Sequence, residues 1–373
     1  MNKENMIIYQ VFVRNHSQQG TFNEVVKDLN RIKSLGTDVL YLMPIHPIGE
    51  IKRKGTYGSP YSIKNYFAIS KDLGTLEDFK NLVNKTHELG MKIILDMVFN
   101  HTSHDNPLYK EHPEYYYHNP DGKPGNHVGD WSDIIDLETK KEEVIEYLVS
   151  VLKYWIAQGV DGFRFDVASL INFKVFTKAR EELGDDVLFL AESIDYDFVN
   201  YLHSMNMTST RDDLLFPTFD LAYAYSWFRP LERHLKGYGN LQDFIDAYNE
   251  DFKLLNGKGL RVNFLGNHDC DRILNYVNKE QLHNLLLMIA KLKGALFIYA
   301  GEEYGISHKP ELFKKDPIIW TKDEEVFSWY VCAIQYKKKQ KRIIDQQMIL
   351  IDGKVKLITK YEDHRIEEAI YAF

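Results

Sequence analysis

The stretch GVDGFRFDVASL, residues 159–170, places two charged side chains on one face of a short predicted strand. Arg164 and Asp166 are two residues apart, so the period of two in a strand points them the same way, while Phe165 and Val167 point to the other face. A buried strand rarely carries charges. We therefore expect this face to line a functional site, in which the arginine keeps the neighbouring carboxylate ionised.

Two further carboxylates end other predicted strands. Glu192 closes the run VLFLAES, 26 residues after Asp166, which is the length of one strand and helix unit, so these two carboxylates should lie on adjacent strands. Asp269 closes a later strand in NFLGNHD. Like charges this close raise the pKa of at least one group, which separates an ionised nucleophile from a protonated acid. Retaining glycoside hydrolysis requires such a pair.

Two histidines stand beside these acids. The run DMVFNH begins at Asp96 and ends at His101, and His268 directly precedes Asp269. Histidines at strand ends next to carboxylates favour contacts with sugar hydroxyls. The segment HTSHD, residues 101–105, lacks the helical spacing of a zinc protease, so we predict no metal site there.

The elements that must position these side chains alternate along the chain. Apolar, strand-like runs are followed by amphipathic helical segments, and those at residues 21–36, 75–90 and 141–159 each end in a glycine suited to a helix stop. Eight such units predict an α/β fold, a closed (β/α)8 TIM barrel whose site lies at the C-terminal ends of the strands. The predicted strands are residues 7–14, 38–44, 92–100, 162–168, 187–193, 214–221, 261–269 and 295–303.

Two segments depart from this alternation. The chain after the third strand is rich in His, Tyr, Asp, Gly and Pro without helical period, which predicts a small inserted domain. The last residues alternate weakly around a two-residue Asp-Gly hairpin signal, which predicts a short C-terminal β segment. We therefore expect the barrel at residues 1–100 and 140–342, the inserted domain at 101–139 and the β segment at 343–373.

Composition narrows the classes of partner and location. The net charge of −8 argues against nucleic acid, and the basic run KKKQKR, residues 337–342, indicates a solvated helix end. No apolar run is long enough to cross a membrane, and the N-terminus lacks the pattern of a signal peptide, so we expect a cytoplasmic protein. Cys270 and Cys332 have no metal-binding spacing and are expected to stay thiols.

Four segments resemble the signature regions of the alpha-amylase family, glycoside hydrolase family 13. They are DMVFNH, GFRFDVASL, AES and FLGNHD, at residues 96–101, 162–170, 191–193 and 264–269. The segment IIDLE around Asp136 is similar to the family's motif in its inserted domain B. The stretch KGTYGSPYSIKNYFAIS, residues 54–70, resembles the segment that follows the second strand in the family.

The resemblance implies a role for each matching residue. Asp166 would be the nucleophile, Glu192 the general acid and base, and Asp269 the group that stabilises an oxocarbenium-like sugar. Arg164 would orient Asp166, Asp96 would hold Arg164, His101 and His268 would bind sugar hydroxyls and Tyr61 would stack on the sugar ring. The implied substrate-binding set is thus Tyr61, Asp96, His101, Arg164 and His268.

The resemblance also implies an activity. We expect a monomeric retaining hydrolase that cleaves α-1,4-glucosidic bonds of starch or malto-oligosaccharides and needs no cofactor for its chemistry. An α-glucosidase or a transglycosylase of the same family, or a non-catalytic carbohydrate-binding protein, remains an alternative. Asn100 and Asp136 match positions that bind a structural calcium in many members, so calcium stays open. Ser169 and Leu170 stand where many members have lysine and histidine, so contacts to the reducing end should differ.

Overall fold

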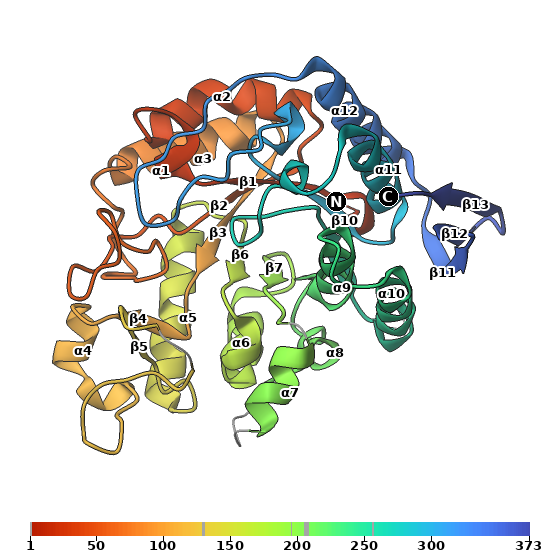
Figure 1. The fold of residues 1–373 in the computed structure, drawn as a ribbon. Coiled ribbons are helices and arrows are strands. Elements are labelled where there is room, and N and C mark those ends of the chain that lie inside the picture. The colour runs from red at the N-terminus through yellow and green to blue at the C-terminus, as the bar shows by residue number, and fades with distance from the viewer. Residues whose placement is uncertain (1, 129–130, 195, 205–208, 256) are drawn as a thin grey trace.

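In the computed structural model of the protein, which describes residues 2–128, 131–194, 196–204, 209–255 and 257–373, eight parallel strands close into a barrel (Figure 1). Their order around the barrel is β1, β10, β9, β8, β7, β6, β3, β2. The predicted TIM barrel is thereby confirmed. The strands are β1 (Ile7–Val11), β2 (Val39–Leu42), β3 (Lys92–Met97), β6 (Gly162–Phe165), β7 (Leu188–Ala191), β8 (Leu221–Tyr223), β9 (Leu260–Asn263) and β10 (Ala295–Tyr299).

Helices surround the barrel, and three of them match the predicted helical segments closely. In α3, Thr75 and Asp78 form a reciprocal capping box that fixes the first turn, while Phe79 and Leu82 face the core. The α-helices outside the inserted segment are α1 (Val13–His16), α2 (Phe22–Ser34), α3 (Leu76–Glu88), α5 (Glu142–Ala157), α6 (Phe173–Leu183), α7 (Tyr196–Ser204), α8 (Asp212–Leu215), α9 (Tyr225–Leu235), α10 (Leu241–Leu255), α11 (Lys279–Lys291) and α12 (Glu324–Lys339). Short 3-10 turns are η1 (Lys3–Asn5), η2 (Pro113–Tyr115), η3 (Ala168–Leu170), η4 (Ile273–Asn275) and η5 (Glu302–Tyr304).

The sixth predicted strand begins later than its sequence pattern indicates. Residues 214–221 are predicted to form it, but their beginning lies in α8 and the strand β8 starts only at Leu221. Pro217 lies between the two elements and has no N–H for a central ladder, so the chain cannot pair until it has passed this residue. The apolar side chains before it, Leu215 and Phe216, pack into the core from a helical turn instead of a strand.

The segment inserted after β3 builds a short antiparallel pair, β4 (His101–Ser103) and β5 (Ile134–Asp136), with the helix α4 (Pro107–Glu111) between them. It stands apart from the barrel at the lower left of Figure 1. The register pairs His101 with Asp136, so the first residue of the insertion is fixed beside the barrel mouth. The extent of this domain, residues 101–139, stays a prediction.

A three-stranded antiparallel sheet ends the chain, at the right of Figure 1: β11 (Ile343–Ile351), β12 (Lys354–Tyr361) and β13 (Ile366–Tyr371). The predicted hairpin is confirmed, because Asp352 and Gly353 between β11 and β12 have φ angles of 49° and 72°, the two positive values of a type I′ turn.

The basic run before this sheet differs from its prediction. Lys337 is fully buried and its ammonium group donates to Gln340 Oε1 at 2.8 Å and to the Leu292 carbonyl. Burial lowers the pKa of Lys337 to about 7. The interpretation as a solvated helix end is therefore wrong for this lysine, because the helix α12 packs its last turn against the barrel.

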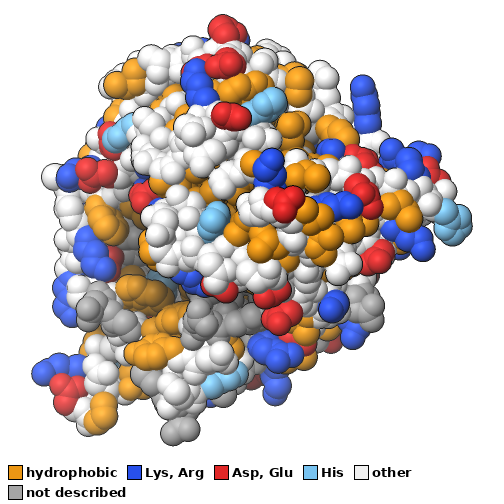
Figure 2. Space-filling model, turned by 45° about the vertical axis from the view of Figure 1, so that its right-hand side comes forward, with side chains coloured by type: hydrophobic (Ala, Val, Ile, Leu, Met, Phe, Trp, Pro, Cys, Tyr) orange, Lys and Arg blue, Asp and Glu red, His pale blue; other side chains and the backbone are white. Residues whose placement is uncertain are grey.

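The surface carries both signs of charge. In the view of Figure 2, basic and acidic side chains lie close to one another over most of the face. Among the described residues, no helix is long and apolar enough to cross a membrane. Both cysteines are free thiols, with Cys270 buried and Cys332 exposed.

Candidate active site

A pocket of about 330 Å³ lies at the C-terminal ends of the barrel strands. It collects residues that are far apart in the sequence, because each ends a different strand or begins the loop that follows one. Six of the eight predicted site residues line it: Tyr61, His101, Asp166, Glu192, His268 and Asp269. The other two, Asp96 and Arg164, lie beneath its floor and are almost completely buried.

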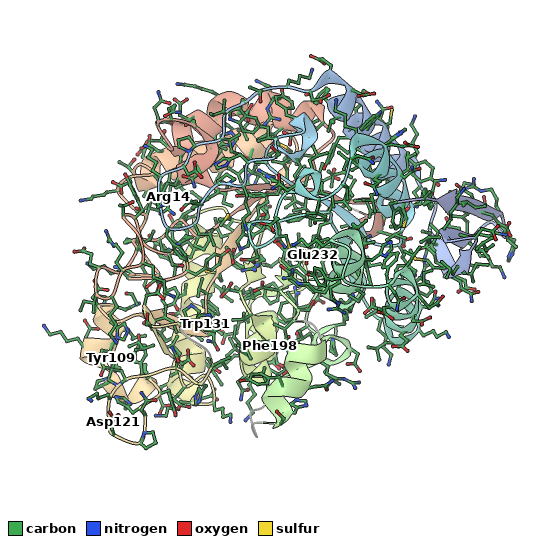
Figure 3. The ribbon with its side chains drawn as sticks, viewed as in Figure 1. Arg14, Tyr109, Asp121, Trp131, Phe198 and Glu232 are labelled. Carbon is green, nitrogen blue, oxygen red and sulfur yellow. The ribbon has the colours of Figure 1, made fainter. Side chains whose placement is uncertain are left out.

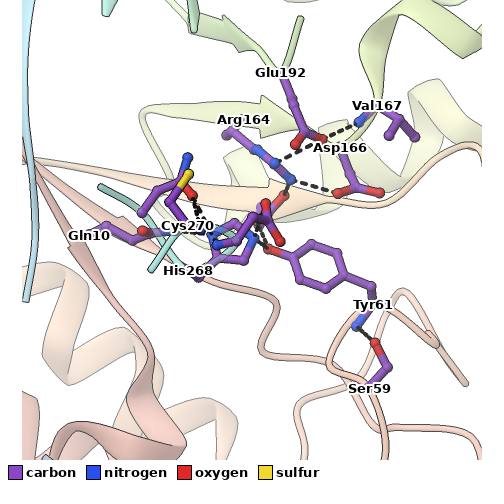
Figure 4. Close-up of polar contacts among 12 residues, drawn as sticks. Gln10, Ser59, Tyr61, Arg164, Asp166, Val167, Glu192, His268 and Cys270 are labelled. Atoms are coloured by element: carbon purple, nitrogen blue, oxygen red, sulfur yellow. Dashed lines mark hydrogen bonds and ion pairs between the residues drawn. The ribbon is translucent and has the colours of Figure 1, made fainter. Parts of the chain in front are cut away.

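Arg164 joins the acidic groups under the pocket (Figure 4). The strand register places Asp96 of β3 opposite Arg164 of β6, and Nη1 of Arg164 lies 2.7 Å from Oδ1 of Asp96. The same Nη1 donates to Oδ1 of Asp166 at 2.8 Å, and Nη2 lies 2.9 Å from Oε2 of Glu192. One guanidinium therefore fixes both carboxylates that are predicted to perform the chemistry, as the common direction of Arg164 and Asp166 suggests.

Each of these two carboxylates keeps one oxygen for the pocket. Oε2 of Glu192 accepts a hydrogen bond of 2.7 Å from the backbone N–H of Val167 in addition to its ion pair with Arg164. Among the described residues, neither Oε1 of Glu192 nor Oδ2 of Asp166 has a partner. The anchored oxygens orient the groups, and the free oxygens are available to a bound molecule.

Val167 has a conformation that the sequence does not indicate. The strand pattern predicts that it continues the strand on the face of Phe165, but β6 ends at Phe165 and Val167 adopts the left-handed region with φ 38° and ψ 47°. This region is costly for a β-branched residue. The turn aims its N–H at Glu192 and brings Val167 itself into the pocket lining, so the strained residue serves the site.

Opposing influences act on the pKa of Asp166. Burial raises the pKa of Asp166 well above its ordinary value, and the charge of Glu192 adds to this rise, although Arg164 lowers it. The 2.8 Å contact from Nη1 of Arg164 is the interaction that opposes this rise, so the expectation that Arg164 keeps this carboxylate ionised stays a prediction.

A second network, built on Tyr61, closes the other side of the pocket floor. The hydroxyl of Tyr61 donates to Oδ2 of Asp96 at 3.0 Å, and its oxygen lies 2.5 Å from Nε2 of His268. Gln10 Nε2 lies 2.8 Å from Nδ1 of His268 and donates to it, so the ring proton belongs on Nε2, which is also 3.1 Å from Oδ2 of Asp269. Tyr61 and His268 stack with their ring planes 17° apart.

The two histidines are neutral hydrogen-bonding groups. Burial lowers the pKa of His101 to about 4 and the pKa of His268 to about 3. His101 starts β4, so the inserted segment delivers it to the pocket. Neutral imidazoles in a pocket that also holds three carboxylates can donate to and accept from hydroxyl groups.

Comparison with known proteins shows the family of the chain. The sequence matches the alpha-amylase catalytic domain over residues 7–131, 127–218 and 173–348. Alpha-amylase 3 of Dictyoglomus thermophilum is 30% identical over 369 residues, which cover 86% of this chain and 68% of the relative. The chain belongs to the alpha-amylase family.

Other relatives show the range of this family. The alpha-1,4-glucan:maltose-1-phosphate maltosyltransferase of Picrophilus torridus is 33% identical over 58% of this chain, which spans 36% of that relative. The crystal structure of an alpha-amylase from Lactobacillus plantarum is 40% identical and superposes with a TM-score of 0.91 over 95% of this chain and 86% of that one. A noncanonic maltogenic alpha-amylase from Thermotoga neapolitana is 30% identical, with a TM-score of 0.87 over 100% of this chain and 86% of that one. The protein is an enzyme of the alpha-amylase type.

At the position of Asn100 and Asp136, where calcium stays a prediction, the carboxyl group is hydrogen-bonded within the protein. Both oxygens of Asp136 accept protein hydrogen bonds, one from the Asn100 amide at 3.2 Å and one from the His127 backbone N–H at 2.7 Å. Burial raises the pKa of Asp136 to about 7. Within the described residues, no group of three or more His, Cys, Asp or Glu side chains is placed to hold a metal ion.

Several pocket residues of this alpha-amylase family member carry no signal in the sequence pattern. Trp131 comes from the inserted segment and Phe198 from α7, and both line the pocket (Figure 3). They lie in loops or on a helix after a strand, where no period or motif marks them. The one feature that could have pointed to them is their aromatic type, in segments that follow a predicted strand without a regular pattern. The remaining missed residues include Lys54, Asp133, Tyr225, Arg229, Leu312 and Phe313.

Proposed function

We propose that this protein is a retaining glycoside hydrolase that cleaves α-1,4-glucosidic bonds of malto-oligosaccharides or starch. The observation that carries the proposal is the double anchoring by Arg164, which contacts one oxygen of Asp166 and one of Glu192. Two carboxylates at the ends of one guanidinium are held close together, as a retaining enzyme needs at about 5–5.5 Å. The relation to alpha-amylases supports the choice of an α-glucan.

The proposed first step uses the two free oxygens. Oδ2 of Asp166 attacks the anomeric carbon while Oε1 of Glu192 gives its proton to the glycosidic oxygen, and the bond between that carbon and that oxygen breaks. The product is a glycosyl ester on Asp166 and a released sugar. Asp269, with a side chain 37% exposed to the pocket, stabilises the positive charge that develops on the ring.

The second step reverses these roles. Glu192 takes a proton from water, the water oxygen bonds to the anomeric carbon and the ester bond to Asp166 breaks, so the configuration is retained. His101 and His268 hold ring hydroxyls, and Tyr61 offers its ring face to the sugar. These steps use only side chains of this chain, and the monomeric state and the cytoplasmic location stay predictions.

The replacement Asp166→Asn tests the proposal. The amide keeps an oxygen for Arg164 but is a poor nucleophile, so release of reducing ends from maltoheptaose should fall by more than about 1,000-fold, while circular dichroism stays unchanged. Proton NMR of the first products of the unmodified enzyme should show the α-anomer. Near-normal rates in this variant, or a β-anomer as the first product, would refute the proposed mechanism.

A further inference from the structure

A segment that follows β10 and η5 crosses over α1, at one edge of the barrel mouth, and is bound to it. We call residues 309–316 the crossing segment. The fully buried Asn15 donates from Nδ2 to the Glu311 carbonyl at 3.0 Å and accepts from the Asp316 N–H at 2.9 Å, and Arg14 donates to the Leu312 carbonyl. Bonds at both of its ends make the crossing segment part of the rigid structure.

The crossing segment joins the loop that follows β2. The N–H of Tyr57 donates to the Phe313 carbonyl at 2.9 Å. At Gly55, which has a φ of 62°, a Cβ atom would lie 2.6 Å from that same carbonyl oxygen. Only glycine permits this approach and this backbone angle, so the two backbones touch here. Gly55 and Phe313 therefore close the space between the two loops at this point.

The loop after β2 also contacts the inserted domain, so the line of contacts that begins at the crossing segment extends to that domain. Nζ of Lys54 forms an ion pair of 2.7 Å with Oδ1 of Asp133, whose side chain is 5% exposed. The Asp133 carbonyl accepts a hydrogen bond of 2.9 Å from Oγ of Ser62. We call Phe313, Gly55, Lys54 and Asp133 the rim. Its side chains Phe313, Lys54 and Asp133 all line the catalytic pocket.

The order of the strands decides which side of the substrate the rim faces. Glu192 ends β7, and the acid must stand next to the leaving group, so the released part of the substrate extends toward the loops after β6 and β7. Those loops carry Val167, Ile194 and Phe198. The rim comes from the loops after β2 and β10, across the barrel. It therefore stands opposite the two carboxylates at the anomeric carbon, on the side of any units bound to the non-reducing end of the sugar.

We propose that the rim closes the non-reducing side of the pocket, so that the enzyme acts only on the non-reducing end of an α-glucan and releases a short sugar of fixed length. This inference rests on the proposed hydrolysis and specifies its substrate. The pocket volume of about 330 Å³ agrees with it, because it lies at the low end of the roughly 300–1,000 Å³ of ligand sites. An enzyme that cleaves the interior of a long glucan needs a groove that is open on both sides of the cleaved bond. Here such a groove would have to pass through the residues of the rim.

Maltoheptaose labelled at its reducing end tests the inference when it is compared with the same sugar carrying a 4,6-ethylidene block on its non-reducing glucose. The rim predicts that the free-ended sugar gives one short unlabelled product from the first time points, while the blocked sugar is cleaved at least 100-fold more slowly. Equal rates with products of mixed length would overturn the inference and leave the hydrolysis intact. Cleavage of neither sugar would refute the proposed hydrolysis itself.

Substitutions in the rim test whether its side chains cause the rejection of the blocked sugar. Lys54→Ala combined with Phe313→Ala removes the ion pair to Asp133 and the aromatic side chain, so the rate on the blocked sugar should rise at least 10-fold relative to the free-ended sugar. Lys71→Ala is the matched control, because Lys71 is exposed and lies outside this pocket. The control should keep the ratio of the unmodified enzyme. A double variant that still rejects the blocked sugar would show that the rim does not set the specificity.

Discussion

Arg164 is a single buried cation among three carboxylates. It contacts Asp96, Asp166 and Glu192, and its side chain is 0% exposed. Burying charges costs free energy that good geometry must offset, and removing one partner leaves the others uncompensated. The arrangement therefore holds the acids in place, and Arg164 opposes the rise that burial causes in the pKa of Asp96 and Asp166.

The pH dependence of activity follows from this position. The nucleophile must be ionised, so activity falls as pH drops through the pKa of Asp166, which burial raises and Arg164 lowers. Arg164→Ala removes the lowering influence and should move the acidic limb of kcat/KM to higher pH, by about one unit or more, with a rate loss of at least about 100-fold. Arg164→Lys keeps the positive charge, so the acidic limb of the pH profile should stay close to its original pH. The rate should still fall, because an ammonium group lacks the planar, forked hydrogen-bonding geometry of a guanidinium.

The two variants control for structural damage. A merely distorted site would lower the rate without moving the limb, so pH profiles are recorded beside circular dichroism for both proteins. An Arg164→Ala enzyme that is folded, slow and unchanged in its acidic limb would show that Arg164 does not tune Asp166.

The residues that the sequence identifies share one property. Asp166, Glu192 and Asp269 each end a predicted strand, and the strand ends of a closed barrel meet at its C-terminal face whatever the lengths of the loops between them. Phe313 and Lys54 do not end a predicted strand, so the sequence pattern does not place them at the pocket. Their loops meet only when the whole barrel has closed. The conformation of Val167 is likewise absent from the local pattern, because its left-handed turn depends on a hydrogen bond to Glu192 from the next strand.

At the scale of elements, the pair β4 and β5 depends on a buried carboxyl group. Asp136 ends β5 and is 3% exposed, and burial raises its pKa from 3.8 to about 7. A raised pKa in the folded state means that this group stabilises the fold at low pH and that the contribution is lost as pH rises toward 7. Between pH 5 and pH 8 this amounts to about 2–3 kcal/mol at 1.36 kcal/mol per pKa unit.

Asp136→Asn should abolish this dependence. The free energy of unfolding of the unmodified protein should fall from pH 5 to pH 8 by about 2–3 kcal/mol more than that of the variant, measured by urea denaturation. Asp121→Asn in the same insertion is the control, because Asp121 is exposed. If calcium raised the melting temperature of the unmodified protein at pH 8 but not that of Asp136→Asn, the carboxylate would be an ionised cation ligand and the present account would fail.

Elements differ in how well the sequence specifies them. The helices α2, α3 and α5 have a regular apolar period and clear ends, and they match their predicted segments. The strand β8 has only three residues, which is too short for a period of two to show. The apolar run before it is the stronger local signal, but it folds as helix because Pro217 blocks pairing there.

At the scale of the whole molecule, Gln346 attaches the C-terminal sheet to the barrel. This side chain of β11 is 3% exposed and uses both ends of its amide. Oε1 accepts from the Tyr248 hydroxyl of α10 and from the Lys293 N–H at 2.9 Å, just before β10. Nε2 donates to the Lys291 carbonyl at 2.9 Å and to Oγ1 of Thr359 in β12 at 2.7 Å. One residue thus joins two strands of the sheet to two helices and a loop of the barrel.

Gln346→Ala should therefore destabilise the protein without changing its chemistry. The substitution leaves the Lys293 N–H and the Tyr248 hydroxyl without their partner, while the Lys291 carbonyl keeps the hydrogen bond from Gln340 Nε2. Each buried unsatisfied group costs about 1–3 kcal/mol before the fold relaxes. We expect the free energy of unfolding in urea to fall by about 2–4 kcal/mol, with kcat per folded molecule unchanged. Gln347→Ala is the matched control, because this neighbouring glutamine is exposed and should alter stability by no more than about 0.5 kcal/mol. Equal losses in the two variants would mean that the sheet is held to the barrel by apolar packing alone, and that the hydrogen bonds of Gln346 are exchanged for water without cost.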